Sequence, residues 1–167
     1  MKKNSFWTFS TFFLTLASMS MISAGCSQKK VKPEDEIASP QRIEDNSLGS
    51  SDHGNALGLK TVHFAYDSPL LTDEAKQILK ENQKILKDHS QVKVQIEGYC
   101  DNRGGIQYNL ALGEKRANSV KLFLKGLGIS EDRLSTVSYG KERPLVEGDS
   151  EDAYAQNRRA NFAITAK

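Results

Sequence analysis

The chain has 167 residues, with 23 Lys and Arg against 21 Asp and Glu, and 38% of its residues are hydrophobic. This length fits one domain with appendages and is too short for several domains. The near balance of charge argues against a nucleic-acid-binding surface or a polybasic membrane patch, so nucleic acid is not an expected partner.

The first 25 residues have the pattern of a secretory signal peptide. Lys2 and Lys3 come first, residues 6–22 are mostly apolar or hydroxylated, and small residues precede Cys26. A basic start, an apolar middle and a small-residue end are typical of a cleaved signal, and a retained transmembrane helix is the less favoured alternative. Cleavage removes both lysines and leaves 21 basic residues against 21 acidic ones.

Residues 23–26, Ser-Ala-Gly-Cys, resemble the lipobox of bacterial lipoproteins, in which the cysteine becomes the acylated N-terminus. Ser23 stands where that family usually has Leu, and an ordinary signal peptide with a chance cysteine is the alternative. Each buried methylene contributes about 0.8 kcal/mol, so two or more acyl chains anchor a protein stably. We therefore expect Cys26 to be lipidated. Since Ser27, not Asp, follows it, the resemblance implies the outer membrane, with the domain facing the periplasm.

Residues 26–58 are expected to comprise the lipidated Cys26 and a disordered tether over residues 27–58. They are polar, contain Pro33 and Pro40, and show no sustained apolar period. Such a segment buries too little apolar surface to offset the entropy lost on ordering. The sequence therefore predicts one folded domain over residues 59–167.

Strand and helix patterns alternate through this domain. Period-two alternation predicts strands, whereas spacing of three and four residues predicts helices, with Thr72 and Ser150 as N-caps. The order is β-α-β-α-β-α-β, an α/β two-layer sandwich. The expected strands cover about residues 59–66, 92–97, 134–139 and 160–164, and the expected helices about 72–86, 108–125 and 150–157.

Polar side chains gather where the second strand leads into the second helix. Asp101 lies in the Gly-rich loop, and Asn109, Leu112 and Arg116 fall within about 60° of each other on one edge of the helix. Arg can offer a planar fork to a carboxylate, and Asp can accept from an ammonium. The pattern predicts a cleft for a small zwitterion, with an ordinary solvated loop and helix as the alternative.

Five segments carry a resemblance to a known family. They are VHFAYDS, EGYCDNRGG, YNLALGEKRANSV, VSYGKERP and AYAQNRRA. Together they make residues 59–167 resemble the OmpA-like peptidoglycan-binding domain, in its peptidoglycan-associated lipoprotein (Pal) branch. The resemblance implies a mixed four-stranded sheet.

The resemblance also implies a binding mode. In this family the domain holds the diaminopimelate of the peptidoglycan stem peptide non-covalently, with the Asp at position 101 on its amine and the Arg at position 116 on its carboxylate. The residues carried over to the same cleft are Tyr66, Asp67, Arg103, Asn109 and Leu112. Tyr99-Cys100 departs from the His-Ala that family members commonly show.

The implied role is to couple the outer membrane to the wall within the Tol-Pal system, in envelope integrity and cell division. The expected partners are peptidoglycan and TolB, with other Tol proteins as further candidates. TolB would bind a surface that overlaps the peptidoglycan site. A different OmpA-like lipoprotein without Tol partners is the alternative. No metal, cofactor or nucleotide motif is found.

An enzyme is the weakest alternative. It would need Cys100 paired with His63 or His89, or a carboxylate pair of Asp67 and Asp101. A lone buried Cys is usually a small apolar residue, so we expect binding and not catalysis.

Overall fold

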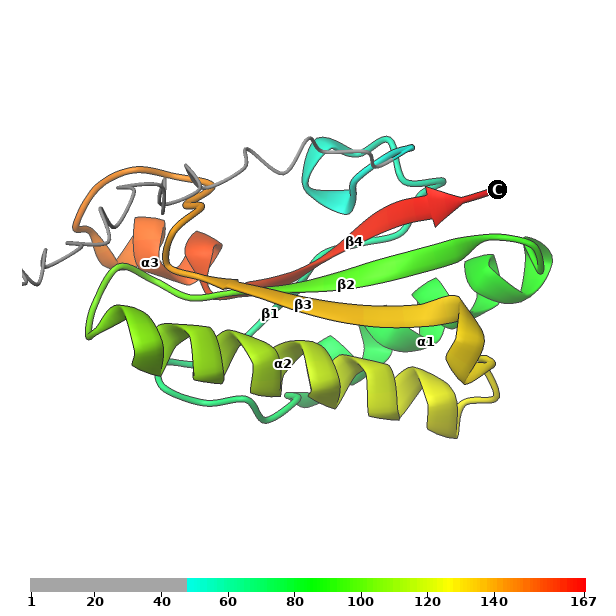
Figure 1. Ribbon diagram of the computed structural model, residues 1–167, viewed down its shortest axis with the longest axis horizontal. Coiled ribbons are helices and arrows are strands. Elements are labelled where there is room, and N and C mark those ends of the chain that lie inside the picture. The colour runs from blue at the N-terminus through cyan, green and yellow to red at the C-terminus, as the bar shows by residue number, and fades with distance from the viewer. Residues whose placement is uncertain (1–47) are drawn as a thin grey trace, which may run out of the picture. The chain divides into compact units, whose positions relative to one another are not determined.

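The computed structural model describes residues 48–167. The expected signal peptide, Cys26 and the first part of the tether lie outside the described residues. The described part is a four-stranded sheet in the order β1-β4-β2-β3, with α1 and α2 on one face (Figure 1). The elements are β1 Val62–His63, α1 Asp73–Asp88, β2 Lys93–Tyr99, α2 Ile106–Gly126, β3 Leu134–Gly140, α3 Glu151–Asn157 and β4 Arg159–Ala166, with short 3-10 turns at Ser51–His53 and Glu131–Arg133.

The sheet is mixed, as predicted. β2 lies parallel to β3 and antiparallel to β4, and β1 is antiparallel to β4. A parallel pair needs a crossover connection, and α2 supplies it between β2 and β3. The loop that leaves β2 therefore leads directly into the first turn of α2, so that the polar loop and helix of the predicted site are neighbours.

Two of the three predicted helix starts are confirmed by their caps, whereas α2 begins at Ile106, two residues before its predicted start, and has no side-chain cap. Thr72 Oγ1 accepts a hydrogen bond from the Ala75 N–H at 3.1 Å, and Ser150 Oγ accepts from the Ala153 N–H at 3.2 Å. Each bond satisfies an N–H group that the helix itself leaves unpaired. Acidic residues follow both caps in the first turn, where they interact favourably with the helix dipole.

The first strand is much shorter than predicted. Only Val62 and His63 pair with β4, although residues 59–66 alternate as a strand should. The rest of that edge of β4 is taken by an earlier segment. The N–H of Leu48 donates to the Ile164 carbonyl at 2.7 Å, and the N–H of Ile164 donates to the Gly49 carbonyl at 2.8 Å. Two short segments thus share one edge of the sheet.

The predicted tether is wrong for residues 48–58, which pack onto the sheet. Ser50 is 6% exposed and Ala56 is fully buried. The Asn161 side-chain oxygen accepts hydrogen bonds from the hydroxyls of Ser50 and Ser51 and from the N–H of Asp52. The segment is polar and therefore reads as disordered, but hydrogen bonds to the buried Asn161 and the burial of Ala56 in the core hold it on the sheet. The folded domain therefore begins by residue 48.

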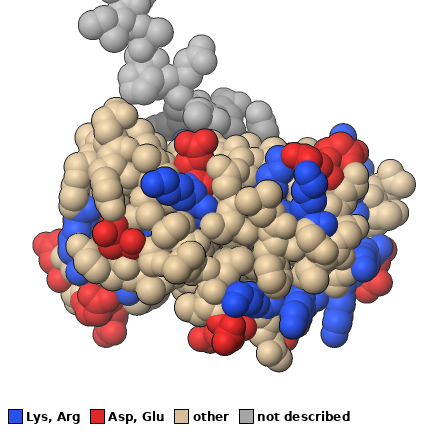
Figure 2. Space-filling view, turned by 90° about the horizontal axis from the view of Figure 1, so that it is seen from below, with Lys and Arg blue, Asp and Glu red and all other residues tan. Residues whose placement is uncertain are grey.

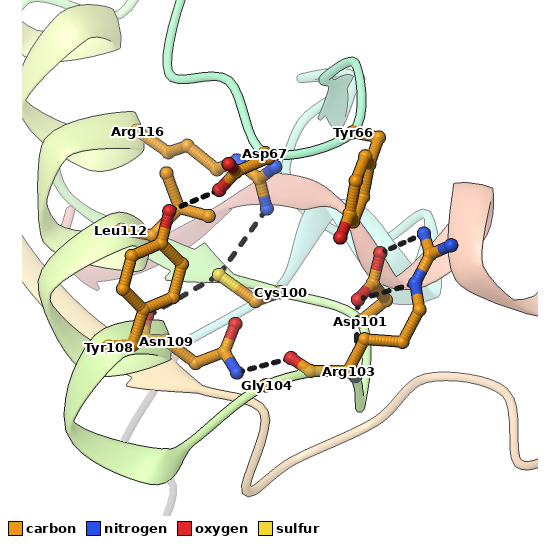
Figure 3. A pocket seen from close by; sticks show the side chains of 10 residues that line it. All are labelled: Tyr66, Asp67, Cys100, Asp101, Arg103, Gly104, Tyr108, Asn109, Leu112 and Arg116. Carbon is orange, nitrogen blue, oxygen red and sulfur yellow. Dashed lines mark hydrogen bonds and ion pairs between the residues drawn. The ribbon is translucent and has the colours of Figure 1, made fainter.

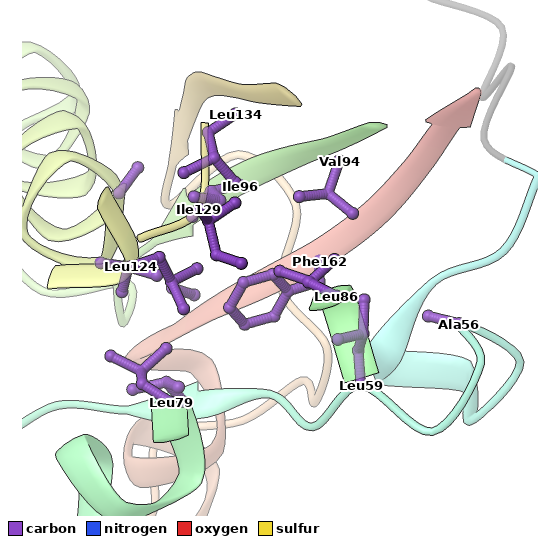
Figure 4. Close-up of a cluster of buried hydrophobic side chains, with 14 of the residues drawn as sticks. Ala56, Leu59, Leu79, Leu86, Val94, Ile96, Leu124, Ile129, Leu134 and Phe162 are labelled. Atoms are coloured by element: carbon purple, nitrogen blue, oxygen red, sulfur yellow. The ribbon is translucent and has the colours of Figure 1, made fainter. Parts of the chain in front are cut away.

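The hydrophobic core fills the space between the sheet and the two long helices (Figure 4). Phe162 of β4 is fully buried at its centre, against Leu79 and Leu86 of α1 and Leu124 of α2.

On the outer surface of the helix-bearing side, Lys and Arg are interspersed with Asp and Glu (Figure 2).

One close approach fixes α2 against the sheet. A Cβ atom added to Gly98 on β2 would lie 1.9 Å from the carbonyl oxygen of Gly113 on α2, so only glycine fits there. This contact holds the first half of α2 beside the end of β2. It thereby positions the polar residues of the loop and of the helix for a common site.

Candidate binding site

A pocket of about 220 Å³ opens between the β1–α1 loop, the β2–α2 loop and the first half of α2 (Figure 3). It contains every residue that the sequence predicted for the site, so the structure brings all seven together. Their role as ligands stays a prediction. The lining residues are Tyr66, Asp67, Cys100, Asp101, Arg103, Gly104, Tyr108, Asn109, Leu112 and Arg116.

Asp101 supplies a buried negative charge. Asp101 is 4% exposed. Both of its carboxylate oxygens accept hydrogen bonds from arginines. Oδ2 accepts from Arg103 Nη2 at 2.7 Å and from Arg158 Nη1 at 3.4 Å, and Oδ1 accepts from Arg103 Nε at 3.3 Å. Burial alone would raise the pKa of Asp101, but the hydrogen bonds from Arg103 and Arg158 bring this pKa below its ordinary value. The carboxylate is therefore ionised at neutral pH.

Arg103 covers Asp101 from the pocket side. Its guanidinium lies between the rings of Tyr66 and Tyr154, 4.1 Å from each centroid. Its Nη1 is 3.6 Å from a carboxylate oxygen of Glu151, and its side chain is 34% exposed. The hydrogen bond to Asp101 raises the pKa of Arg103, so the pair is a charged one.

Arg116 does not offer the open fork that the sequence predicted. It is 1% exposed, and four of its five N–H groups are engaged: Nε with the Ser68 carbonyl, Nη1 with the Tyr99 carbonyl and the Cys100 sulfur, and Nη2 with the Ala65 carbonyl. The β1–α1 loop closes over the guanidinium and uses its donors. Arg116 can thus give a ligand one N–H and a positive charge, but no bidentate contact.

The charge of Arg116 is nevertheless important for the pocket. Among residues 48–167, no carboxylate forms a salt bridge with it. Burial lowers the pKa of Arg116, because the charged form has lost its water. A cation held by neutral carbonyls in a low-dielectric wall attracts an anion strongly. The pocket therefore has a buried positive charge as well as a buried negative one.

The first turn of α2 adds further donors. Gly105 occupies the N-cap position without a side-chain cap, and the first turn carries no acidic residue. Asn109 holds the loop in place by donating to the carbonyls of Arg103 and Gly105 at 2.7 and 3.1 Å. Gly104 has a φ of +82°, a conformation that side chains rarely adopt. The unpaired N–H groups of this turn bring partial positive charge to the pocket edge.

The remaining wall combines apolar and aromatic surface. Leu112 is 8% exposed, and Tyr66 is 61% exposed at the rim. Asp67 accepts a hydrogen bond from the Tyr108 hydroxyl and has a φ of +51°, which is uncommon outside glycine. This strained position turns the Asp67 carboxylate toward α2 and closes one side of the pocket (Figure 3).

Sequence reasoning missed several residues of this site. Tyr108 lines the pocket, and Tyr154, Glu151 and Arg158 hold Arg103 and Asp101 from α3 and its end. Arg158 lies in AYAQNRRA, one of the segments that carried the resemblance, and this was the available signal. No local pattern links α3 to a loop some fifty residues earlier, so its contribution required the fold.

The arrangement of Cys100 does not match a thiol catalyst. Its sulfur contacts the Asn109 carbonyl and Arg116 Nη1, each at 3.4 Å, while His63 contacts the Ala155 carbonyl. Burial raises the pKa of Cys100 to about 11, so the thiol is neutral. Within the described part of the chain, no group of three His, Cys, Asp or Glu residues is placed to hold a metal ion.

Comparisons with known proteins identify the family of the chain's relatives. The model of the OmpA family matches residues 63–158. A peptidoglycan-associated lipoprotein of Pseudomonas aeruginosa is 39% identical over 161 residues, covering 90% of this chain and 94% of the relative. The protein of the same name from Haemophilus influenzae is 46% identical over 103 residues, covering 62% of this chain and 67% of the relative.

Solved structures extend the comparison to the fold. The crystal structure of the peptidoglycan-associated lipoprotein from Burkholderia pseudomallei is 39% identical, with a TM-score of 0.62, and the match covers 66% of this chain and 95% of that one. The C-terminal domain of Helicobacter pylori MotB shares the fold at 22% identity, with a TM-score of 0.59 over 63% of this chain and 83% of that one.

Proposed function

The chain belongs to the OmpA family, in its peptidoglycan-associated lipoprotein branch, and from this premise we propose that it binds peptidoglycan non-covalently. The ligand is the diaminopimelate of the stem peptide, whose free end carries an ammonium and a carboxylate on the same carbon. The protein holds this group and performs no chemical step on it.

The observation that carries the proposal is the pair of buried opposite charges in one small pocket. Asp101 is an ionised carboxylate at 4% exposure, and Arg116 is a guanidinium at 1% exposure. Asp101 receives the ligand ammonium. The charge of Arg116, its remaining N–H and the first turn of α2 receive the carboxylate. Leu112 packs against the methylenes between the peptide and this zwitterion, while Tyr66, Asp67, Arg103 and Asn109 complete the wall.

The same proposal places the domain in the periplasm, anchored to the outer membrane. Residues 1–25 act as a cleaved signal, Cys26 carries the lipid, and the following residues up to 47 form the tether. Fully extended, such a tether spans at most about 75 Å. Over residues 48–167, no helix is long and apolar enough to cross a membrane. With its lipid in the membrane and its pocket on the stem peptide, the protein couples the membrane to the wall.

Co-sedimentation with isolated peptidoglycan tests wall binding. The chain should start at residue 27, because a start at residue 59 would remove the Ser50 and Ser51 hydroxyls that bond Asn161. We expect Asp101→Ala to weaken retention by about 2–5 kcal/mol, roughly 30-fold or more, because the ligand ammonium is left buried and unpaired. Glu81→Ala, which alters an exposed pair on α1, is the control and should sediment like the parent.

Arg116→Lys is the second variant in the same assay. A lysine keeps the positive charge but loses the bonds to the Ala65, Ser68 and Tyr99 carbonyls, so we expect severe loss of retention. If both site variants sediment like the parent, the pocket is not the wall-binding site. Release of soluble wall fragments would instead indicate an enzyme.

The proposal includes TolB, with other Tol proteins as further candidates, as a partner at a surface that overlaps the pocket. Tyr66 and Tyr108 flank the pocket and are 61% and 56% exposed, and exposed aromatic residues favour protein contacts. We expect purified TolB to reduce co-sedimentation with the wall in a dose-dependent way. Equal retention at saturating TolB would favour an OmpA-like lipoprotein that acts without Tol partners.

A further inference from the structure

Resting on this proposed function, we infer that Arg103 makes the pocket selective for a zwitterion by exchanging its partner. Without a ligand, Arg103 occupies Asp101. When a ligand ammonium takes Asp101, the released guanidinium joins Arg116 and the first turn of α2 in holding the carboxylate of the same ligand.

The first observation is that the amine subsite is already filled. Arg103 gives Asp101 three hydrogen bonds: from its backbone N–H at 3.2 Å, from Nε at 3.3 Å and from Nη2 at 2.7 Å. An arriving ammonium therefore meets a carboxylate that is already paired. It must displace the side-chain hydrogen bonds of Arg103, because both carboxylate oxygens of Asp101 already accept hydrogen bonds from arginines.

The second observation is that Arg103 has contacts that do not involve an acid. Its guanidinium carbon lies 4.1 Å from the ring centroids of Tyr66 and Tyr154, and these cation–π contacts can hold the side chain while its edge changes partner. Its side chain is 34% exposed, so the guanidinium edge is accessible from the pocket. Figure 3 shows it beside Tyr66, with that edge toward Asp101.

The third observation is that both partners have a second charged neighbour. Arg158 Nη1 lies 3.4 Å from Asp101 Oδ2, which provides the carboxylate with a buried cation besides Arg103. Glu151 lies 3.6 Å from Arg103 Nη1 and 2.8 Å from Arg158 Nη2, which provides Arg103 with an acid besides Asp101. Arg116 cannot perform the exchange, since four of its N–H groups are bound to the main chain and Cys100.

These three observations predict a selectivity. A ligand with only an ammonium replaces one cation at Asp101 with another. It leaves Arg103 with the more distant Glu151, so the ligand gains little binding energy. A ligand with only a carboxylate reaches Arg116 and the first turn of α2, but finds Arg103 engaged with Asp101. A zwitterion replaces one ion pair with two, and it alone gains on both sides.

Two stem tripeptides that differ by one carboxylate provide the test. One carries meso-diaminopimelate at its third position, and the other carries L-lysine, which has the side-chain amine without the adjacent carboxylate. Titration calorimetry on the chain from residue 27 should give at least a tenfold preference for the diaminopimelate peptide.

Arg103→Gln removes the exchanging cation and the competitor at Asp101. We expect it to bind the lysine peptide at least threefold more tightly than the parent does, and its preference for diaminopimelate to fall below threefold. Arg143→Gln is the matched control, because Arg143 also lies 4.1 Å over a tyrosine ring, that of Tyr139, but outside this pocket. It should keep the parental preference.

If Arg103→Gln prefers the diaminopimelate peptide over the lysine peptide as strongly as the parent does, the inference is overturned. Arg103 would then have only a structural role in the β2–α2 loop. Arg103→Lys gives a second reading where the Gln variant folds poorly, since it keeps a cation but lacks the planar fork. Its preference should lie between those of the parent and the Gln variant, and full parental preference would again overturn the inference. A parent chain that binds neither tripeptide would refute the proposed function itself.

Discussion

Arg158 and Arg159 are consecutive residues, yet they belong to two different ion-pair systems. Arg158 contacts Asp101, which is also paired with Arg103 at the pocket. Arg159 pairs at 2.8 Å with Asp52, which belongs to the segment that precedes β1. The carboxylates are equally buried, with side-chain exposures of 6% for Asp101 and 5% for Asp52.

The difference lies in the partners. The Arg159 side chain is 4% exposed and lies 3.8 Å over the Tyr99 ring, and the second oxygen of Asp52 accepts from the Thr61 hydroxyl. The Arg103 side chain is 34% exposed beside a cavity. The same two residue types thus form a closed structural pair in one place and an exchangeable pair in the other. Access to the arginine, not burial of the acid, distinguishes them.

The largest effect should come from opening the closed pair. Asp52→Ala leaves Arg159 buried without its carboxylate, and breaking one side of a buried pair costs about 3–5 kcal/mol. Urea unfolding should show this loss of free energy, whereas the folded variant should still bind the wall, because Asp52 lies outside the pocket. Glu81→Ala, in an exposed pair with Lys60, should leave the midpoint unchanged. An unchanged midpoint for Asp52→Ala would contradict the structural role.

A smaller effect is expected at Arg158, which contacts Asp101 together with Arg103. Arg158→Gln removes the second cation from Asp101 and the 2.8 Å contact with Glu151. Hydrogen bonds to charged groups contribute about 1.5–3 kcal/mol, and we expect a stability loss of that size. Asp101 then depends on Arg103 alone, so the exchange becomes harder and wall retention should fall about tenfold. Retention equal to the parent would show that Arg158 does not support the exchange.

The pH dependence should separate the open pair from an isolated acid. Hydrogen bonds from Arg103 and Arg158 lower the pKa of Asp101 below the ordinary 3.8, despite its burial. A lowered folded-state pKa means that the contribution of Asp101 is fully present above pH 3.8 and is lost as the pH falls through the lowered value. Wall retention at pH 5 should therefore be within about twofold of that at pH 7. Arg103→Gln should begin to lose retention at a higher pH than the parent.

The elements that the sequence predicted well are the locally determined ones. Thr72 and Ser150 cap their helices as expected, because an N-cap depends on a residue and the N–H three positions later. The length of β1 could not be predicted, since residues 48–50 compete for the same edge of β4 from outside the alternating run. Pairing between distant segments carries no local signal.

The site likewise combines features with a local sequence signal and features that depend on distant contacts. The helical angle and the family resemblance brought Asp101, Asn109, Leu112 and Arg116 to one pocket. The state of Arg116 was not predictable, because its donors are used by carbonyls of a loop about fifty residues earlier, and only the folded chain brings them there. The sequence thus indicates which charged residues form the site, whereas tertiary contacts determine which of them can change its partner.

Cys100 gives the smallest expected effect and tests whether the departure at Tyr99-Cys100 alters the pocket. Its sulfur is a long 3.4 Å partner of Arg116, whose other bonds go to carbonyl oxygens at 2.8–3.0 Å. Cys100→Ala removes the weakest of these contacts and leaves a small residue in place. We expect wall retention unchanged within twofold and a stability loss of about 1 kcal/mol or less in urea unfolding. Because the pKa of this thiol is raised to about 11, alkylation by iodoacetamide at pH 8 should also be slow in the folded protein. Rapid labelling, or a large loss of retention in Cys100→Ala, would place the thiol among the groups that hold the ligand and would make the anchoring of Arg116 less rigid than its three carbonyl bonds indicate.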